Sequence, residues 1–383
     1  MNDLPYDVAI VGGGIVGAAC AFYAARDGLR VYACDRGAAG GGTTGTGSGH
    51  IVAMDAPPEM LALTRYSQRL WQELAPSLPA TACYRERGTI WTARSEAELG
   101  ELDEKESVFR SAGVPTERLD PGQLRVAEPL LVPDLAGGLR VPEDALVEPV
   151  AATEFLWRSA RARGARVEPH RAVRRLRDGV VEFSDGSEVR AQEIVNAAGV
   201  DAPELSPTCA IEPRRGHLLR LGPAPGALSH AVVEVGYTGS TRSDEPVSVA
   251  FNAQPQVDGS ILLGSSRERG VRDPGVDPAV IDRVRERARS FAPRLAALPT
   301  LEVRSGVRPA TADHRPWIGR LPGTVGQWVA AGHEGLGITA SLGTGRIIAD
   351  LLKGRPAAIP IAGFSPTRAR SPSAATRLAG ADR

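Results

Sequence analysis

Three glycines near the amino terminus have the spacing of a turn that binds the phosphates of a dinucleotide. Gly12, Gly14 and Gly17 lie between a strand predicted at 7–11, apolar from residue 8, and a helical pattern at 18–27. The first glycine permits a tight turn, the second lets a pyrophosphate approach the backbone, and the third lets helix and strand pack closely. The phosphates would meet the free N–H groups at the positive end of the helix. We therefore predict a dinucleotide site here.

A single acid follows at the distance that such a site requires. Asp35 lies 23 residues after Gly12, at the end of a second strand predicted at 30–34. It is placed to accept hydrogen bonds from ribose hydroxyls. Strand, helix and acid in this order favour a bound dinucleotide over an empty glycine-rich turn. NAD and FAD use the same motif, so the motif alone leaves both open.

The next segment favours FAD. Residues 37–49 consist only of Gly, Ala, Thr and Ser, whereas an NAD domain normally continues as regular βα units. A loop of small residues suits a second close approach of backbone to the pyrophosphate and then to a flavin ring. A flexible linker is the alternative, although linkers seldom follow the ribose-binding strand directly. A nicotinamide-dependent dehydrogenase would also leave the second glycine-rich segment, 332–345, unexplained.

Composition limits the class of protein and of partner. A length of 383 residues suggests about two to three domains. The 45 basic and 45 acidic residues balance, which argues against binding nucleic acid or an anionic membrane through bulk charge. The four cysteines show no CxxC pair or metal-ligand spacing, which predicts free thiols in a reducing compartment and no metal. We expect no secretory leader and no spanning helix, hence a cytoplasmic protein.

The order of predicted elements is that of an α/β protein. A βαβ unit at 7–35 is followed by helical patterns and strand-rich stretches. Helices are predicted at 61–74, 96–112, 150–163, 277–291 and 345–352, and strand-rich stretches at 165–199, 211–263, 303–307 and 327–331. Residues 369–383, rich in Ser, Ala and Arg, are predicted to form a disordered tail.

Three segments, in order, carry a resemblance to a known family. They are DVAIVGGGIVGAACAFYAARDGLRVYACDR at 7–36, IVNAAGVDAPEL at 194–205 and GHEGLGITASLGTGRIIADLL at 332–352. With them the chain resembles the D-amino-acid oxidase and glycine oxidase superfamily of FAD-dependent amine oxidoreductases. The resemblance implies a Rossmann-like FAD-binding domain and a second, strand-rich α+β substrate-binding domain. We expect the FAD domain at 1–85, 145–210 and 300–368, and the substrate domain at 86–144 and 211–299.

The resemblance also implies the cofactor contacts. The residue matching Val173 would contribute backbone contacts on the adenine side, and the loop that ends at His50 would follow the ribityl chain and flavin. Backbone N–H groups at 335–338 and the next helix terminus would stabilise negative charge on the reduced flavin. The full predicted set is Gly12, Gly14, Ile15, Val16, Gly17, Asp35, Arg36, Thr43, Thr44, Ser48, Gly49, His50, Val173, Ala197, Gly199, Gly335, Leu336, Gly337, Ile338 and Thr339.

A motif near the carboxyl terminus resembles the substrate end of the family. SGVRPATADHRPWIG at 305–319 is similar to the family segment GxRPxTxDxxPxIG, in which the arginine matching Arg308 binds the substrate carboxylate. Arginine suits this role because its planar fork makes a bidentate, charge-assisted pair. A structural salt bridge is the alternative. His333 precedes the flavin-contacting turn and is predicted, with Arg308, to be catalytic; its alternative is a packing role.

Four further residues are predicted to line the substrate pocket. His50 and Glu334 are assigned there by their positions in the motifs. Phe251 and Asn252 are assigned because their strand should cross the floor of the substrate domain, although each could be an ordinary sheet residue. His217 is expected to border the site without taking part in catalysis.

The implied reaction is hydride transfer from the α-carbon of a neutral amine to flavin N5. It gives an imine, which hydrolyses to a keto acid or persists if the amine is cyclic. The protein's part would be orientation, in line with the lack of paired carboxylates. The electron acceptor, oxygen or a respiratory chain, stays open, as do peripheral association with the inner membrane, a homo-oligomer and a partner subunit.

The substrate hypothesis rests on one local stretch. TGSGHIVAMD at 46–55 and LTRYSQRLW at 63–71 resemble D-hydroxyproline dehydrogenases, so the leading substrate is cis-4-hydroxy-D-proline or a related cyclic D-amino acid. The alternatives are a glycine or sarcosine oxidase, another D-amino-acid dehydrogenase, or a non-catalytic FAD subunit of a larger dehydrogenase. The presence of Arg308 argues against the last of these.

Overall fold

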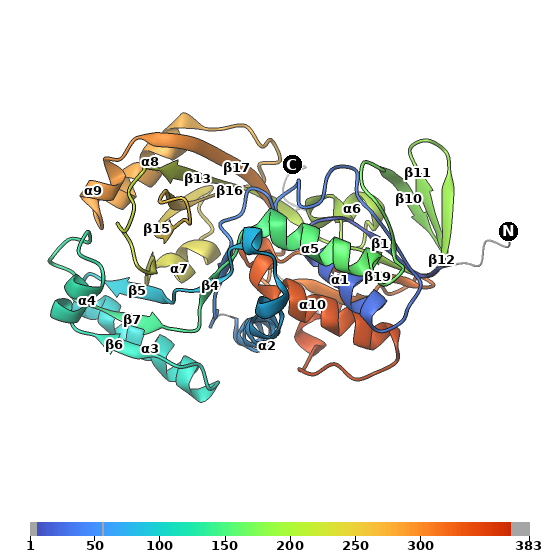
Figure 1. The fold of residues 1–383 in the computed structure, drawn as a ribbon, viewed down its shortest axis with the longest axis horizontal. Helices are drawn as coiled ribbons and strands as arrows, with labels where there is room; N and C mark the ends of the chain where they lie inside the picture. Colours follow the sequence, from blue (N-terminus) through green and yellow to red (C-terminus); the bar gives the residue numbers. More distant parts are fainter. Residues whose placement is uncertain (1–5, 56, 369–383) are drawn as a thin grey trace, which may run out of the picture.

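The computed structural model describes residues 6–55 and 57–368. The tail predicted at 369–383 lies outside the described residues. Two large sheets lie toward opposite ends of the long axis (Figure 1). They correspond to the two kinds of domain that the sequence predicts, one with a parallel centre and one strand-rich.

The first sheet has a parallel core. Strand β1 (Tyr6–Val11) pairs in parallel with β2 (Val31–Cys34) on one side and with β12 (Glu188–Asn196) on the other. Helix α1 (Ile15–Arg26) joins β1 to β2, so the predicted βαβ unit is confirmed. The other strands are β9 (Arg166–Glu168), β10 (Val173–Arg177), β11 (Val180–Phe183), β18 (Trp317–Arg320) and β19 (Gln327–Ala331).

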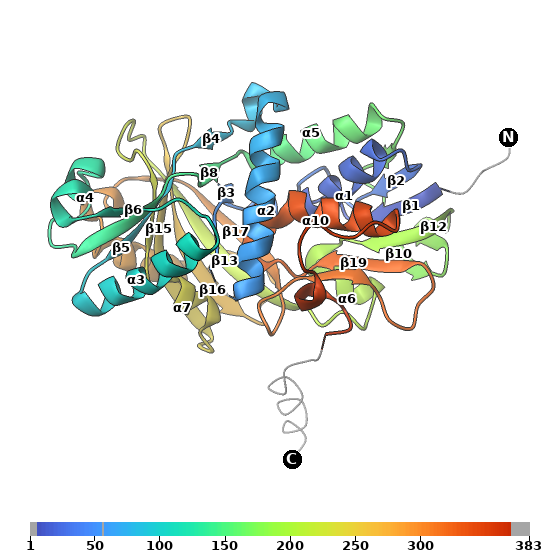
Figure 2. The ribbon, with the colours of Figure 1, turned by 90° about the horizontal axis from the view of Figure 1, so that it is seen from below.

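Helices bury the apolar faces of this sheet. Helix α1 packs between α5 (Pro149–Arg161) and α10 (Gly337–Leu352), and α2 (Pro58–Leu74) packs on α10. Figure 2 shows α2 between the two halves of the molecule. The short α6 (Ala202–Leu205) follows β12.

The carboxyl-terminal helix differs from its prediction. The sequence predicts a loop up to residue 345, but α10 begins at Gly337. The glycines inside the helix serve packing rather than loop geometry. A Cβ atom on Gly345 would lie 2.5 Å from the carbonyl carbon of Ala19, and one on Gly343 would lie 2.3 Å from Ser67 Oγ. Glycine therefore lets α10 approach its neighbours closely.

The second sheet has eight strands in the order β17-β13-β16-β15-β14-β5-β7-β6. Their bounds are Thr300–Ala310, Glu212–Leu221, Ile261–Arg269, Val247–Pro255, Ala231–Glu234, Thr89–Ala93, Gly137–Val141 and Glu117–Leu119. Its helices are α3 (Glu96–Ser111), α4 (Pro121–Ala127), α7 (Tyr237–Arg242), α8 (Pro278–Arg289) and α9 (Pro293–Ala296). The predicted domain boundary at 300 is wrong, because β17 pairs with β13 over residues 300–310.

A small sheet connects the two halves. Its strands are β3 (His50–Ile51), β8 (Ala145–Leu146) and β4 (Arg85–Glu86). Strand β3 directly follows the glycine-rich loop at 37–49, so the end of that loop is fixed at the junction. Within residues 6–55 and 57–368, no helix has both the length and the apolar character of a membrane span.

The contact between α1 and α10 can be tested at Gly345. Alanine there should lower the free energy of unfolding by about 1–3 kcal/mol, because the added methyl group overlaps backbone atoms of Ala19. Gly100→Ala in α3, where no atom lies within 4 Å of the added group, is the matched control and should raise it by up to about 1 kcal/mol. Urea denaturation of both variants measures the two effects. Equal effects would contradict the packing role.

Candidate active site

The turn between β1 and α1 admits only glycine at two positions. Gly12 has φ +118°, and a Cβ atom on it would lie 2.3 Å from the carbonyl oxygen of Ala197. A Cβ atom on Gly17 would lie 1.9 Å from the carbonyl oxygen of Gly12. Gly12, Gly17 and Ala197, all predicted cofactor residues, are thus in close backbone contact at the amino terminus of α1.

Two side chains hold this turn in shape. The carboxylate of Asp35 accepts hydrogen bonds from Gly13 N at 2.6 Å and from Gly37 N at 2.7 Å. Thr44 Oγ1 accepts one from Ile15 N at 3.1 Å. The predicted acid and the predicted loop threonine therefore lie at the glycine-rich turn itself.

The amino termini of α1 and α10 are left without a neutralising side chain. Neither helix has a side-chain cap or an acid in its first turn. Four other helices, α3, α4, α5 and α8, begin on side-chain caps, which are Ser95, Asp120, Glu148 and Asp277. The first turns of α1 and α10 hold the predicted residues 15–17 and 337–339. The Ile15 N–H already donates to Thr44 Oγ1, and the remaining first-turn N–H groups suit anionic parts of a ligand.

The predicted adenine end lies beside Asp35. The N–H of Arg171 donates to the backbone oxygen of Asp35 at 2.7 Å, and Val173 begins β10 two residues later. Arg36 pairs with Asp201 at 2.8 Å, just after Gly199 with its φ of +59°. These residues come from separate segments but surround one end of the turn.

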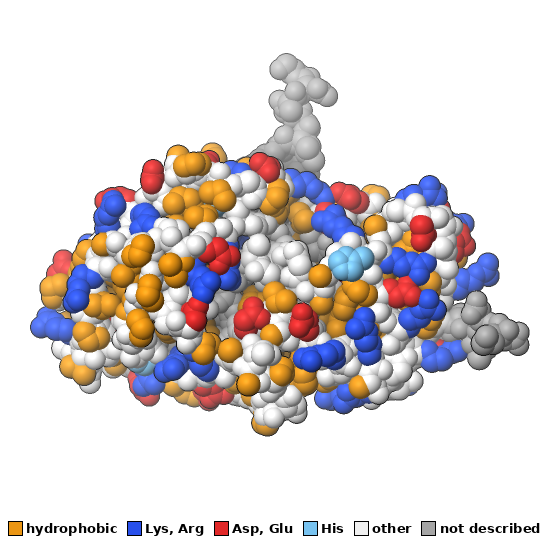
Figure 3. All heavy atoms as spheres, turned by 45° about the horizontal axis from the view of Figure 1, so that its top comes forward, with side chains coloured by type: hydrophobic (Ala, Val, Ile, Leu, Met, Phe, Trp, Pro, Cys, Tyr) orange, Lys and Arg blue, Asp and Glu red, His pale blue; other side chains and the backbone are white. Residues whose placement is uncertain are grey.

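The loop at 37–49 reaches across to the second sheet. Thr43 Oγ1 donates to the backbone oxygen of Val307 at 2.5 Å. A Cβ atom on Gly306 would lie 1.9 Å from Thr46 Oγ1, and one on Gly49 would lie 1.9 Å from Val147 O. Ser48 is half-buried in this loop. Figure 3 shows a hollow near the middle of one face, where backbone and uncharged polar side chains gather with charged groups around them.

Strand β17, which accepts this hydrogen bond from the loop, also carries Arg308. Arg308 lies opposite Arg214 in the β17–β13 register, so both side chains project from the same face. Its guanidinium lies against Gly216, where a Cβ atom would be 2.2 Å from Nη1, and it donates to Ser266 O at 2.8 Å. Arg267 of β16 extends the group. We call Arg214, Arg267 and Arg308 the arginine cluster.

One carboxylate and one phenol accompany the arginine cluster. Arg267 lies 3.1 Å from the Glu334 carboxylate and donates to Tyr237 Oη at 2.9 Å. Burial raises the pKa of Glu334, but the charges of Arg267 and Arg308 outweigh it and hold the pKa at about 2. Burial also raises the pKa of Tyr237, but the charges of Arg267 and Arg308 outweigh this effect and bring the pKa below its usual value.

Positive charge therefore exceeds negative charge at this place. Among residues 6–55 and 57–368, neither Arg214 nor Arg308 has a carboxylate within 4 Å, and Arg214 is 3% exposed. Buried cations that outnumber their counter-charges are costly, which favours an anionic ligand. The arrangement fits a carboxylate bound by Arg308 beside the amino terminus of α10.

Two predicted site residues belong to the interior instead. Phe251 is completely buried and stacks on Phe291 at 4.8 Å, so its prediction as a pocket residue is wrong. His333 is 4% exposed and its Nε2 lies 2.9 Å from Thr344 Oγ1 in α10. Burial lowers the pKa of His333 to about 3, so the ring is neutral. Its place supports the packing alternative.

The other two predicted pocket residues lie differently. Asn252 follows Phe251 in β15 and therefore projects from the opposite face, where its Oδ1 accepts from Gln254 Nε2 at 3.3 Å. His50 is half-buried in β3, and its backbone oxygen accepts from Thr339 Oγ1 at 2.9 Å in the first turn of α10. Burial lowers the pKa of the His50 ring to about 4.

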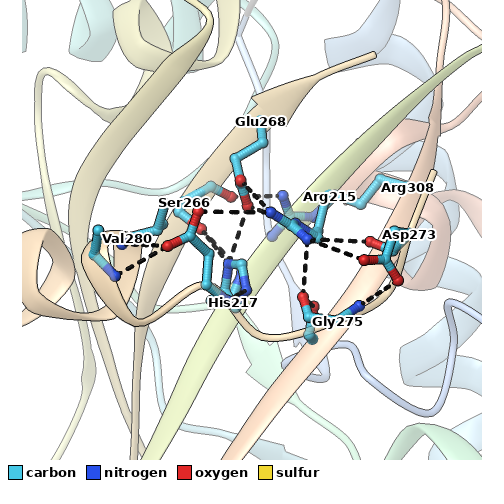
Figure 4. Close-up of polar contacts among 11 residues, drawn as sticks. Arg215, His217, Ser266, Glu268, Asp273, Gly275, Val280 and Arg308 are labelled. Carbon is cyan, nitrogen blue, oxygen red and sulfur yellow. Dashed lines mark hydrogen bonds and ion pairs between the residues drawn. The ribbon is translucent and has the colours of Figure 1, made fainter. Parts of the chain in front are cut away.

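A buried polar cluster supports the strand beneath Arg308. Figure 4 shows Arg215, His217 and Glu268 together, with Arg308 reaching toward Ser266. Arg215 makes a two-pronged pair with Glu268 at 2.8 and 2.6 Å. His217 is fully buried, and its Nδ1 lies 3.2 Å from Ser266 Oγ. Its Nε2 accepts a hydrogen bond from the N–H of Asp277, the N-cap residue of α8, at 3.1 Å. These contacts hold His217 in place beneath the strand of Arg308.

Sequence reasoning missed three residues of the site. Tyr237, Arg267 and Arg214 come from α7, β16 and β13, and none of them belongs to a glycine-rich motif. The signal present in the sequence is weak: arginines at inward positions of strands, where apolar residues are usual. Strand pairing brings Arg214 and Arg267 to Arg308, and Tyr237 joins them from α7.

The family model described as FAD dependent oxidoreductase matches residues 7–351. The chain therefore belongs to this family of FAD-dependent oxidoreductases, and its cofactor is FAD. The free helix termini and the tight glycine turn described above fit that cofactor.

Known relatives resemble the chain over most of its length. Glycine oxidase of Geobacillus kaustophilus is 29% identical over 376 residues, covering 95% of this chain and 97% of that protein. D-amino acid dehydrogenase of Methylobacterium radiotolerans is 29% identical over 313 residues, covering 77% and 71%. The crystal structure of glycine oxidase from Geobacillus kaustophilus has a TM-score of 0.86 at 27% identity, covering 96% of this chain and 100% of that one.

Gly216 offers a test of how Arg308 is positioned. A methyl group there overlaps the guanidinium, a flexible group that can move without unfolding the protein. Gly216→Ala should therefore weaken the binding of acetate, a minimal carboxylate, about tenfold or more, with FAD retained. Perturbation of the flavin absorbance by acetate measures this. Gly100→Ala is the control, and unchanged acetate affinity in Gly216→Ala would refute the assigned contact.

Proposed function

We propose that this protein oxidises the C–N bond of a small α-amino acid to an imine. The observation that carries the proposal is Arg308, which has no carboxylate within 4 Å among the described residues and lies with Arg267 and Glu334 near the start of α10. An α-carboxylate would supply the missing counter-charge. The names of the relatives, glycine oxidase and D-amino acid dehydrogenase, support the same reaction type.

The proposed cofactor contacts follow the glycine-rich elements. The first turn of α1 would hold the pyrophosphate, and the first turn of α10 would hold the pyrimidine edge of the flavin. Bound FAD supplies the acceptor for the hydride that leaves the α-carbon. The remaining task, which falls to this chain's side chains, is orientation of the substrate.

Arg308 would bind the substrate carboxylate in a bidentate pair and so fix the α-carbon. Tyr237 lies next to this place through its hydrogen bond with Arg267, and can add a hydrogen bond to the carboxylate. The arginine cluster repels a protonated amine, so it favours the neutral amine that can release hydride. Glu334 offsets part of the positive charge and keeps Arg267 in place.

For the substrate itself we propose a cyclic D-amino acid, with cis-4-hydroxy-D-proline as the leading candidate. This finer proposal rests on the segments at 46–55 and 63–71. Glycine or sarcosine is the second candidate, supported by the names of the relatives that cover nearly the whole chain. A non-catalytic FAD subunit is disfavoured by the assembly of Tyr237 with Arg267 and Arg308.

An anaerobic mixing experiment tests the proposal. The purified yellow protein is mixed with D- and L-amino acids, glycine, sarcosine and the hydroxyproline isomers, and flavin absorbance is followed. Bleaching by one compound is expected, because its hydride reduces the flavin. Bleaching by none of them would contradict the proposed activity and favour an electron-carrying subunit.

Arg308→Ala separates substrate binding from cofactor binding. Loss of the bidentate pair should raise the half-saturating substrate concentration about tenfold to a hundredfold, with FAD content unchanged. The control is Arg304→Ala, in the same strand, whose side chain pairs with Glu302 at 3.1 Å and should leave the concentration unchanged. Loss of FAD from Arg308→Ala would contradict the assigned role.

A further inference from the structure

A buried carboxyl, that of Asp144, meets a side-chain amide at the seam between the two halves of the molecule. Asp144 lies between β7 and β8 and is 1% exposed, and Gln68 of α2 is equally buried. Gln68 Nε2 donates to Asp144 Oδ1 at 2.8 Å, and the N–H of Ala53 donates to the same oxygen at 2.9 Å. Both lone pairs of Oδ1 are therefore used.

The other oxygen of each group has no partner. Asp144 Oδ2 and Gln68 Oε1 are fully buried and accept no hydrogen bond from any residue in 6–55 or 57–368. The Thr89 hydroxyl acts on the pKa of Asp144 but lacks the geometry of a hydrogen bond. Because neither oxygen is open to solvent, water cannot serve as their donor. A proton on Oδ2, donated to Gln68 Oε1, would give both atoms a bond and close a two-bond acid–amide pair.

The charges around Asp144 also favour a neutral carboxyl. Lys105 of α3 acts on it, but that ammonium is 4% exposed and already pairs with Asp55 at 2.7 Å. Arg65 of α2 pairs with the neighbouring Glu143. Within the described residues, no basic side chain lies within 4 Å of Asp144. An ionised Asp144 would add an unpaired negative charge to the interior, and burial raises its pKa to about 7.

Asp144 anchors the segment that leads out of the glycine-rich loop. Its carboxyl holds the N–H of Ala53, and the preceding N–H of Val52 donates to Thr339 Oγ1 at 3.2 Å, in the first turn of α10. The backbone oxygen of Asp144 accepts from Gly88 N at 2.9 Å, just before β5 of the second sheet. One residue thus ties the proposed cofactor elements to the strand-rich half.

We propose that folded Asp144 keeps a proton on Oδ2 and donates it to Gln68 Oε1, and that release of this proton to solvent is a switch that destabilises the seam. Asp144 and Gln68 are positioning residues for the segment at 50–54. Protonated, the pair has all four of its polar atoms bonded. Ionised, it leaves two buried acceptors and one buried charge without partners. The switch does not depend on which amine is oxidised.

Asp144→Asn tests the proposal because asparagine copies the protonated acid. Its Oδ1 can accept from Ala53 and Gln68 as before, and its Nδ2 carries a permanent hydrogen for Gln68 Oε1. The variant should therefore fold and bind FAD at every pH, whereas the wild type should lose stability as its carboxyl ionises. Urea unfolding of both proteins, at the same excess of FAD and at pH values from 5 to 8.5, gives the ratio of their unfolding constants.

The pH dependence has a definite sign. An unfolded aspartate has a pKa of about 4, whereas burial raises the pKa of folded Asp144 to about 7. Unfolding therefore releases a proton between these values, and wild-type stability falls as pH rises. Relative to Asp144→Asn, the wild-type unfolding constant should increase about tenfold per pH unit from pH 5, and about a hundredfold in all by pH 8.5.

Asp7→Asn is the matched control. Asp7 pairs with Arg30 at 2.7 Å, and this hydrogen bond holds the pKa of Asp7 below its usual value. Its carboxyl is therefore ionised above pH 5 in both the folded and the unfolded chain. The ratio of unfolding constants for this variant should stay within about twofold over the same range.

Infrared difference spectra test the proton directly, without unfolding. The wild type should show the carbonyl band of a protonated carboxylic acid at pH 5.5 and lose it at pH 8.5. The difference between wild-type and Asp144→Asn spectra isolates this carboxyl, because the variant has no acid at that position.

Three results would overturn the inference. They are the lack of a carbonyl band that depends on Asp144, a ratio of unfolding constants for Asp144→Asn that does not change with pH, and failure of Asp144→Asn to fold or to hold FAD. Each would mean that Asp144 is held as a carboxylate in the folded protein.

Discussion

Excess positive charge along the seam between the two sheets is the constraint on which the site depends. Helices α1 and α10 begin without caps or acids, and the arginine cluster faces one nearby carboxylate, that of Glu334. Anionic ligands stabilise charge of this kind. FAD brings a pyrophosphate and, once reduced, a negative flavin. The proposed substrate brings a carboxylate.

Close backbone packing keeps that charge in place. Glycines at the turn before α1 and within α10 allow contacts that any side chain would prevent. The loop at 37–49 then ties the cofactor helix to β17 through Thr43 and Val307. The glycine-rich turn and the strand of Arg308 are therefore linked through this loop, so that a shift of the loop would also affect the strand of Arg308.

Features encoded in contiguous segments could be predicted from the sequence. The βαβ unit, the turn from Gly12 to Gly17 and the position of Asp35 depend on neighbours along the chain. Arg308 was predicted through a motif, by resemblance. The start of α10 was missed because glycines usually indicate a loop, whereas here they permit helix packing against Ala19.

Features that depend on strand pairing were not predictable. Arg267 and Arg214 meet Arg308 only after distant strands align, and Tyr237 reaches Arg267 from helix α7. Phe251 was wrongly predicted to line the pocket because successive side chains of a strand project from opposite faces of the sheet. The local sequence does not indicate whether the face of Phe251 or that of Asn252 carries the site. His333 and Glu334 are a similar case: one ring is buried against α10, while the next side chain meets Arg267.

The central claim is that this positive seam stabilises negative charge on the reduced cofactor and on its ligand. The most direct measurement is the two-electron midpoint potential of the bound flavin, obtained by anaerobic reductive titration against a reference dye. The account predicts a potential more positive than that of free FAD, because α10 and the arginine cluster favour the reduced, anionic form. A potential equal to or more negative than that of free FAD would contradict it.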